Sequence, residues 1–391
     1  MYLVNGRVIT MTGAIHERAM LHLNEGRIAA VIPNGTPPPG TASTDIIDLQ
    51  GKTVIPGLIN CHVHLFLDAN PDPIAAIRRD PLAYQTLQAA RRAGEMLRAG
   101  ITTARDLGGV EHADIALKRA IADGAAQGSR LLVSGKCVVM TGGQGWLFGR
   151  EADGADEVRK ATREQLKAGA DVVKLMATGG VMTPGVEPGA AQFTLEELQA
   201  GVEEAHKGGR RTASHAQGAT GIKNALRAGI DSIEHGIYLD EEAIDLFLKT
   251  GAYLVPTLAA PHFILKGGLA AGIPAYAVEK TKRVMETHCR SVEMARRAGV
   301  KIAAGSDAGT PLNLHADLVT ELELMLGVGF TPMEALNSAT RAAADLLALS
   351  DVGTIEVDKR ADLIVLEQDP LSDLSALRHV NLVLKDGKQV Q

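Results

Sequence analysis

Short apolar segments alternate with amphipathic helical patterns through the middle of the chain, and this alternation constrains the fold more than any other feature. Eight segments have the composition of strands, at residues 53–64, 101–107, 130–139, 171–178, 211–216, 231–235, 252–258 and 301–307. Helical patterns lie between them, for example at residues 82–97, 155–168, 195–206 and 277–298. Alternating strands and helices predict an α/β fold, and eight such units fit a (β/α)8 TIM barrel. An open, doubly wound sheet is the alternative, and it requires a reversal of strand order that sequence does not reveal.

Both ends of the chain carry short strand patterns without helices. We therefore expect residues 1–56 and 348–391 to form a small β-sandwich domain beside a barrel at residues 57–347. The Asn5–Gly6 pair stands between two apolar runs and predicts a hairpin turn. Thr194 and Thr331 are each followed three residues later by Glu, which predicts a capping box at the start of two helices.

Composition narrows the class of partner. Aromatic residues make up 3% of the 391 residues and the net charge is −6, so nucleic acid and anionic membranes are not expected partners. No uncharged apolar run approaches the ~20 residues that span a bilayer. Cys61, Cys137 and Cys289 are far apart and lack metal-ligand spacing. They are typical of free thiols in a reducing compartment, and together with the absence of a signal-peptide pattern they predict a cytoplasmic protein.

Ionisable side chains interrupt five of the apolar strand segments near their carboxyl ends. Residues two apart on a strand point the same way, so the first pair of histidines would aim at one spot. A single histidine on a core strand is more often structural than a ligand. Six ionisable groups at equivalent strand ends would be costly to bury unless a divalent cation organised them. The six residues are His62, His64, Lys174, His215, His235 and Asp307.

Lys174 has two interpretations. It could extend its amine to the barrel rim. It could instead be buried within its apolar strand, and burial would then lower the pKa of the amine.

These residues, in this order, resemble the metal-ligand set of the amidohydrolase superfamily. The resemblance covers the whole chain and is closest to the Xaa-Pro dipeptidase (prolidase-like) and imidazolonepropionase-related branch. The stretches that carry this narrower resemblance are residues 100–108, 141–145, 173–180, 233–238 and 305–311.

The resemblance implies a centre of two divalent metal ions, with zinc as the default. It places His62, His64 and Asp307 on the more buried ion and His215 and His235 on the more exposed one. A carbamate on Lys174 would bridge the two ions. The resemblance further implies hydrolysis of an amide by a metal-activated hydroxide. Asp307 would be the catalytic proton acceptor, and Tyr238 would stabilise the oxyanion or bind substrate.

The expected substrates are dipeptides of the Xaa-Pro type or N-acyl amino acids with a free carboxylate. Gln144, Tyr238 and His315 are the candidate substrate-binding residues, with Arg105 as a further candidate unless it forms a structural ion pair. Relatives often carry His where Gln144 stands, which weakens any transfer of substrate preference. A hydrolase of cyclic amides or of an amide-linked small molecule or toxin is the alternative, and a non-catalytic barrel is a third. A homo-oligomer is expected.

Overall fold

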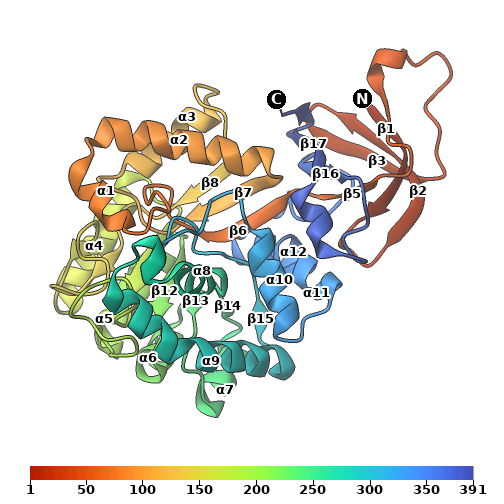
Figure 1. Cartoon of the computed structure of the whole chain (residues 1–391). Coiled ribbons are helices and arrows are strands. Elements are labelled where there is room, and N and C mark those ends of the chain that lie inside the picture. The colour runs from red at the N-terminus through yellow and green to blue at the C-terminus, as the bar shows by residue number, and fades with distance from the viewer. Residues whose placement is uncertain (391) are drawn as a thin grey trace.

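Parallel strands surrounded by helices form the larger part of the molecule in the computed structural model, which describes residues 1–390 (Figure 1). One parallel sheet has the order β6-β7-β8 and the other β10-β9-β11-β12-β13-β14-β15. Their bounds are β6 (Leu58–Val63), β7 (Ile101–Asp106), β8 (Arg130–Val133), β9 (Val138–Val139), β10 (Arg150–Glu151), β11 (Val172–Met176), β12 (Arg211–Ala216), β13 (Ser232–His235), β14 (Tyr253–Val255) and β15 (Lys301–Ile302). The predicted α/β fold with parallel strands is confirmed.

Backbone hydrogen bonds join the two parallel sheets at both edges. On one side the amide of Asp171 donates to the carbonyl of Val133 at 2.8 Å. On the other side the amide of Cys61 donates to the carbonyl of Ala304 at 2.9 Å. The strand carboxyl ends from all parts of the sequence therefore meet at one rim.

The helices follow the predicted alternation. They are α1 (Pro73–Arg79), α2 (Leu82–Arg98), α3 (Ala113–Ala122), α4 (Ala155–Ala168), α5 (Leu195–Lys207), α6 (Ala219–Ala228), α7 (Glu241–Thr250), α8 (Ala259–Gly267), α9 (Ala275–Ala298), α10 (Val319–Gly327), α11 (Pro332–Ser338) and α12 (Arg341–Leu346). Both predicted capping boxes, at Thr194 and Thr331, are present at the starts of α5 and α11. Within residues 1–390, none of these helices has the length and apolarity that crossing a membrane requires.

The chain ends share one sheet at the far end of the molecule, where Figure 1 shows red and blue strands side by side. Its order is β18 (Lys388–Gln389), β17 (Val380–Lys385), β16 (Leu363–Leu366), β5 (Thr53–Pro56), β1 (Tyr2–Ile9), β2 (Ile15–Asn24) and β3 (Arg27–Pro33), with β4 (Ile46–Asp48) also on β1. β16 pairs with β5 antiparallel, which ties the C-terminal strands to the N-terminal ones. Leu3, Val54 and Leu363, from three of these strands, lie in one apolar cluster.

The predicted hairpin at Asn5–Gly6 is wrong. β1 runs straight through both residues, and the pairing with β2 shifts register around Gly6. Asn5 has φ 57°, so the pair forms an irregularity within a strand. A Cβ on Gly6 would lie 2.4 Å from Leu49 Cδ1, so a larger residue here would displace the Leu49 side chain.

Candidate metal centre

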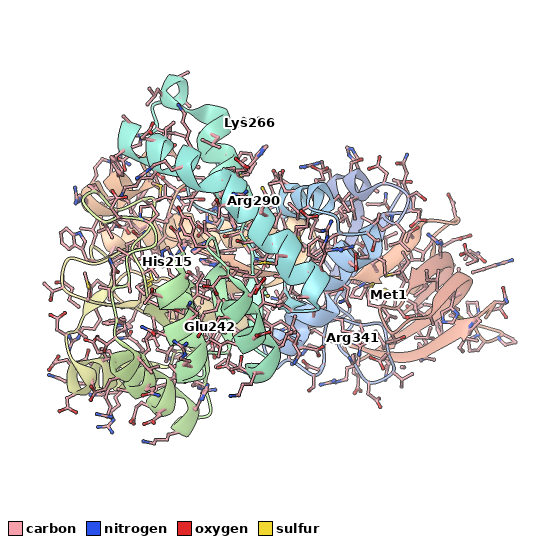
Figure 2. The ribbon with its side chains drawn as sticks, turned by 90° about the horizontal axis from the view of Figure 1, so that it is seen from below. Met1, His215, Glu242, Lys266, Arg290 and Arg341 are labelled. Carbon is pink, nitrogen blue, oxygen red and sulfur yellow. The ribbon has the colours of Figure 1, made fainter. Side chains whose placement is uncertain are left out.

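The rim of strand carboxyl ends brings all six predicted ligands to one cavity. Each of the six residues is at most 8% exposed, and all of them line a cavity of about 890 Å³, counted out to the solvent at its mouth. The register of neighbouring strands sets how far along its strand each ligand lies. Met176 is paired with His215, and Ala216 is paired with His235. Figure 2 shows His215 well inside the outline of the molecule.

Three ligand atoms stand at the spacing that a shared cation imposes. His62 Nε2 lies 3.3 Å from Asp307 Oδ1, His64 Nε2 lies 3.3 Å from the same oxygen, and the two ring nitrogens are 3.3 Å apart. Tetrahedral ligands at ~2.0–2.1 Å from one zinc ion stand roughly 3.3–3.4 Å from each other. His62, His235 and Asp307 each offer an atom within 4.8 Å of the other two.

Three of the four ligand histidines use their outward-facing ring nitrogen as a hydrogen-bond donor. His62 Nδ1 donates to the carboxylate of Glu234 at 2.8 Å, and His215 Nε2 donates to the carbonyl of Gly179 at 3.1 Å. His235 Nδ1 donates to Thr257 Oγ1 at 2.7 Å, because the threonine hydroxyl is itself committed to the Pro256 carbonyl at 2.6 Å. A neutral imidazole has one donor and one acceptor nitrogen. The inner nitrogen of each ring therefore presents a lone pair.

Two of these lone pairs face each other. His235 Nε2 and His215 Nδ1 are 2.9 Å apart, and neither carries a proton to share. Two acceptors at this distance repel unless a cation lies against both. The donor set of imidazole nitrogens and a carboxylate oxygen is the set that zinc prefers, so the residues present fit a divalent metal.

The charge states favour metal binding as well. Burial, with the nearby Lys174 charge, lowers the pKa of His62 to about 4 and that of His215 to about 3. Burial also lowers the pKa of the Lys174 amine. Burial disfavours the Asp307 carboxylate, but His62 and His64 hold its pKa below the usual value. At neutral pH His62 and His215 are therefore neutral and Asp307 is ionised, which are the metal-binding forms.

Three residues at or beside the centre have strained backbone conformations. His235, Thr257 and Asp307 have φ of 74°, 54° and 56°, in the left-handed region that residues other than glycine seldom adopt. Each lies at or just beyond the end of a core strand. Such strain persists where surrounding structure fixes it, and it is frequent at functional sites.

Comparison with known proteins identifies the family. Residues 53–390 match the amidohydrolase family. The chain belongs to this family.

Two kinds of relative are close to this amidohydrolase. The ochratoxinase of Aspergillus niger is 32% identical over 372 residues, which cover 86% of this chain and 75% of that protein. A Xaa-Pro dipeptidase with methionine bound in its active site has a TM-score of 0.91 at 32% identity, covering 99% of this chain and 98% of that one. A prolidase complexed with N-methylphosphonate-L-proline has a TM-score of 0.92 at 32% identity, covering 100% and 99%.

These findings confirm the resemblance that the sequence carries, and they make the protein an enzyme of the hydrolase class. Amidohydrolases generally bind divalent metals, which agrees with the donor set at the rim.

The predicted substrate-binding residues of this amidohydrolase do not all line the cavity. Gln144 lines the cavity, whereas Tyr238 and His315 are not among the lining residues within the described chain. His315 Nε2 donates to the carbonyl of His64 at 2.9 Å and so supports the metal-binding loop from behind. The Tyr238 ring faces Gly189, where an added Cβ would lie 3.4 Å from the ring. Substrate roles for these two residues stay predictions.

A buried charge network lies behind His62, and it confirms the structural ion pair as the interpretation of Arg105. Arg105 forms an ion pair with Glu234 at 2.9 Å and donates to the Cys61 carbonyl at 2.6 Å. Ser232 Oγ donates to the same carboxylate at 2.6 Å. Burial disfavours the Glu234 anion, but Arg105 and His62 outweigh it and lower its pKa to about 2. The only sequence signal was a glutamate inside an apolar strand, next to His235.

The walls of the cavity are largely apolar. Gln217, which sequence reasoning also missed, adds a second carboxamide beside that of Gln144. The larger apolar lining residues are Leu67, Ile74, Phe148, Met176, Met182, Ile237 and Ile264.

Proposed function

We propose that the protein is a binuclear-metal amidohydrolase that cleaves the amide bond of small N-acyl amino acid derivatives and dipeptides, with Xaa-Pro compounds among them. The observation that carries the proposal is the contact of His235 Nε2 with His215 Nδ1 at 2.9 Å, because both nitrogens present lone pairs when the outer nitrogen of each ring is the donor. Hydrolytic relatives that share nearly the whole fold support it.

The proposed centre uses the predicted ligands. His62, His64 and Asp307 would hold one cation, and His215 and His235 the other. Lys174, as a carbamate, would bridge them. Two divalent cations, zinc by ligand preference, would supply an activated water and polarise the scissile carbonyl.

Asp307 is the proposed proton acceptor. Its carboxylate is ionised at neutral pH and lies at the cavity wall, 3.3 Å from the inner nitrogens of two histidines. It can therefore take a proton from the attacking water and deliver it to the leaving nitrogen. Gln144 would contact the substrate, and Tyr238 and His315 are retained as positioning candidates.

A second candidate is a hydrolase of an amide-linked small molecule or toxin. Phe148, Met176 and Ile237 provide apolar walls that suit a bulky acyl or aromatic group. The relationship to a protein named ochratoxinase points in the same direction.

The proposal extends to architecture. The hydrogen bonds at both sheet edges support a closed (β/α)8 barrel at residues 57–347. The shared terminal sheet supports a β-sandwich domain made of residues 1–56 and 348–391. A cytoplasmic homo-oligomer remains the proposed form.

Metal analysis and a substrate library test the proposal together. We expect about two zinc ions per chain after reconstitution, loss of amide hydrolysis on chelation and recovery with zinc. Lys174→Ala should hold fewer than two ions per chain, whereas the exposed Lys282→Ala should bind the full complement.

A library of N-acyl amino acids, dipeptides and arylamides then separates the two candidate functions. Full turnover after metal removal, or no turnover of any amide, would overturn the proposal.

A further inference from the structure

Two buried carboxamides in the cavity lack partners. Gln144 is 8% exposed and Gln217 is 5% exposed, and both line the cavity. The Oε1 atom of each has no hydrogen-bond partner among residues 1–390. A buried polar atom without a partner is costly, so both groups point to a ligand that completes them.

Both carboxamides belong to the surroundings of His215. Gln217 follows His215 by two residues, just past the end of β12. A Cβ added to Gly180 would lie 2.8 Å from both the carboxamide carbon of Gln144 and Nε2 of His215, which places that carboxamide beside the ring. Gln144 therefore lies beside the outer nitrogen of His215, and Gln217 lines the same cavity two residues after that histidine.

The backbone under each glutamine is fixed. The Gln144 amide donates to Gln192 Oε1 at 3.0 Å, and the next amide, Gly145, donates to Thr183 Oγ1 at 3.1 Å. The Gln217 amide donates to Thr178 Oγ1 at 2.9 Å. The main chain from which each carboxamide projects is thus held in place, which favours selective recognition.

No permanently charged lysine or arginine is available beside the two carboxamides in the described part of the cavity. Among the described residues, Lys174 is the one lysine or arginine that lines the cavity, and it belongs to the metal centre. Lys280 lies nearby, but its amine is bound to the backbone carbonyls of Gly180 and Thr183. A substrate carboxylate against apolar walls would meet only neutral donors, which are weaker partners than charged ones.

We propose that Gln144 and Gln217 form a neutral recognition pair, and that the enzyme prefers amides whose leaving group is uncharged, such as an amino-acid amide, over those that carry a free carboxylate. A carboxamide offers one acceptor and two donor hydrogens whichever way it is turned. It therefore complements a peptide or primary amide, which offers the same set. This inference rests on the proposed amide hydrolysis and specifies its substrate class.

A matched substrate pair tests the inference. N-benzoyl-L-phenylalanine and its α-carboxamide differ only in charge at one group. With zinc-reconstituted enzyme, we expect kcat/KM for release of phenylalanine amide to exceed that for phenylalanine by about tenfold or more, the effect of one well-placed interaction. Binding of the two amine products, phenylalanine amide and phenylalanine, is measured in parallel by calorimetry.

Glutamine variants separate recognition from structure. Gln144→Met and Gln217→Met should each lower kcat/KM for the amide by a larger factor than kcat/KM for the acid, so the preference falls toward unity. Gln127→Met, at an exposed glutamine outside the cavity, should keep the full preference. Equal loss for both substrates in the cavity variants would indicate a structural role and would contradict the inference.

The outcomes distinguish the two proposals. If both substrates are hydrolysed and the acid is preferred, the proposed neutral recognition pair is wrong, and the proposed hydrolase activity is unaffected. Tighter binding of phenylalanine amide without turnover of either substrate supports the pair and overturns the hydrolase. Neither binding nor turnover overturns both.

Discussion

At the scale of single residues, the centre depends on groups that would never touch a cation. Glu234, Thr257 and the Gly179 carbonyl each accept a hydrogen bond from the outer nitrogen of one histidine. These acceptors select the ring tautomer, and the tautomer decides whether a lone pair faces the cavity. Such supporting hydrogen bonds are worth ~10–100-fold in metal affinity.

Glu234→Gln should weaken zinc binding by about 10–100-fold, because the amide replaces the anion that orients His62 and leaves Arg105 without its ion pair. Competition with a chromogenic chelator measures the affinity. Glu203→Gln, at an exposed position on α5, is the matched control and should bind zinc normally. Equal affinities in the two variants would mean that the carboxylate does not position His62.

Asp307→Asn should lower turnover by about 10²–10⁴-fold, because asparagine cannot accept the proton from water. The fold should survive, since asparagine adopts the left-handed conformation that φ 56° requires. Steady-state kinetics, with metal content and the circular dichroism spectrum measured on the same samples, check both statements. Near-normal turnover at full metal loading would remove Asp307 from the role of base.

At the scale of helices and strands, the sequence predicted the features that depend on interactions between residues close together in the chain. The alternation of strands and helices, and the capping boxes of α5 and α11, depend on residues close in sequence. The Asn5–Gly6 hairpin failed because Leu49 and the pairing with β2 hold β1 straight at that point. A tertiary contact overrode a turn signal.

The candidate metal centre could likewise be predicted only in part from the sequence. Each of the six proposed ligands is an ionisable residue on an apolar strand, so each could be recognised separately. Their partners could not, because His62 and Glu234 are 172 residues apart and the hydrogen bond between them depends on how two strands lie in space. The unpartnered carboxamide of Gln217 likewise becomes visible only when the cavity exists.

Helix α9 holds one wall of the cavity through Lys280. The amine donates to the carbonyls of Thr183, at 2.9 Å, and of Gly180 and Val186, and Tyr276 donates to that of Met182 at 3.1 Å. Lys280→Met would leave these carbonyls without their donor. We expect amide exchange in residues 180–189 to accelerate at least about tenfold and KM to rise, because the loop carries cavity-lining residues.

Hydrogen exchange with mass spectrometry measures the loop directly. Lys282→Met is the control, since this lysine is exposed on the same helix. If exchange in the loop is the same in both variants, α9 does not fasten it.

At the scale of the whole molecule, burial lowers the pKa values of several histidines and raises those of several carboxyl groups in the metal-free protein. These two shifts have opposite effects on how stability depends on pH. Burial lowers the pKa of His288 to about 4 and that of His315 to about 3, as it does for the three ligand histidines with lowered values. Burial also raises the pKa of Glu321 to about 8, against the backbone amides of Ala259 and Leu258. It raises the pKa values of the neighbouring Asp106 and Asp114 as well.

The metal-free protein should therefore be most stable near pH 6–6.5. Unfolded histidines titrate near ~6.5, above their folded values, so below that pH the unfolded state binds more protons and stability falls toward pH 4. The carboxyl groups act in the opposite sense. Unfolded Asp and Glu ionise near ~4, below their raised folded values, so the folded state retains more protons and stability declines as pH rises toward 8. Below about pH 6.5 the three carboxyl groups offset part of the effect of the five histidines, and above it only the carboxyl groups of these two sets act. Urea unfolding at 25 °C between pH 4.5 and 8 measures the profile, and stability that is flat or rises steadily to pH 8 would show that burial does not keep these groups neutral.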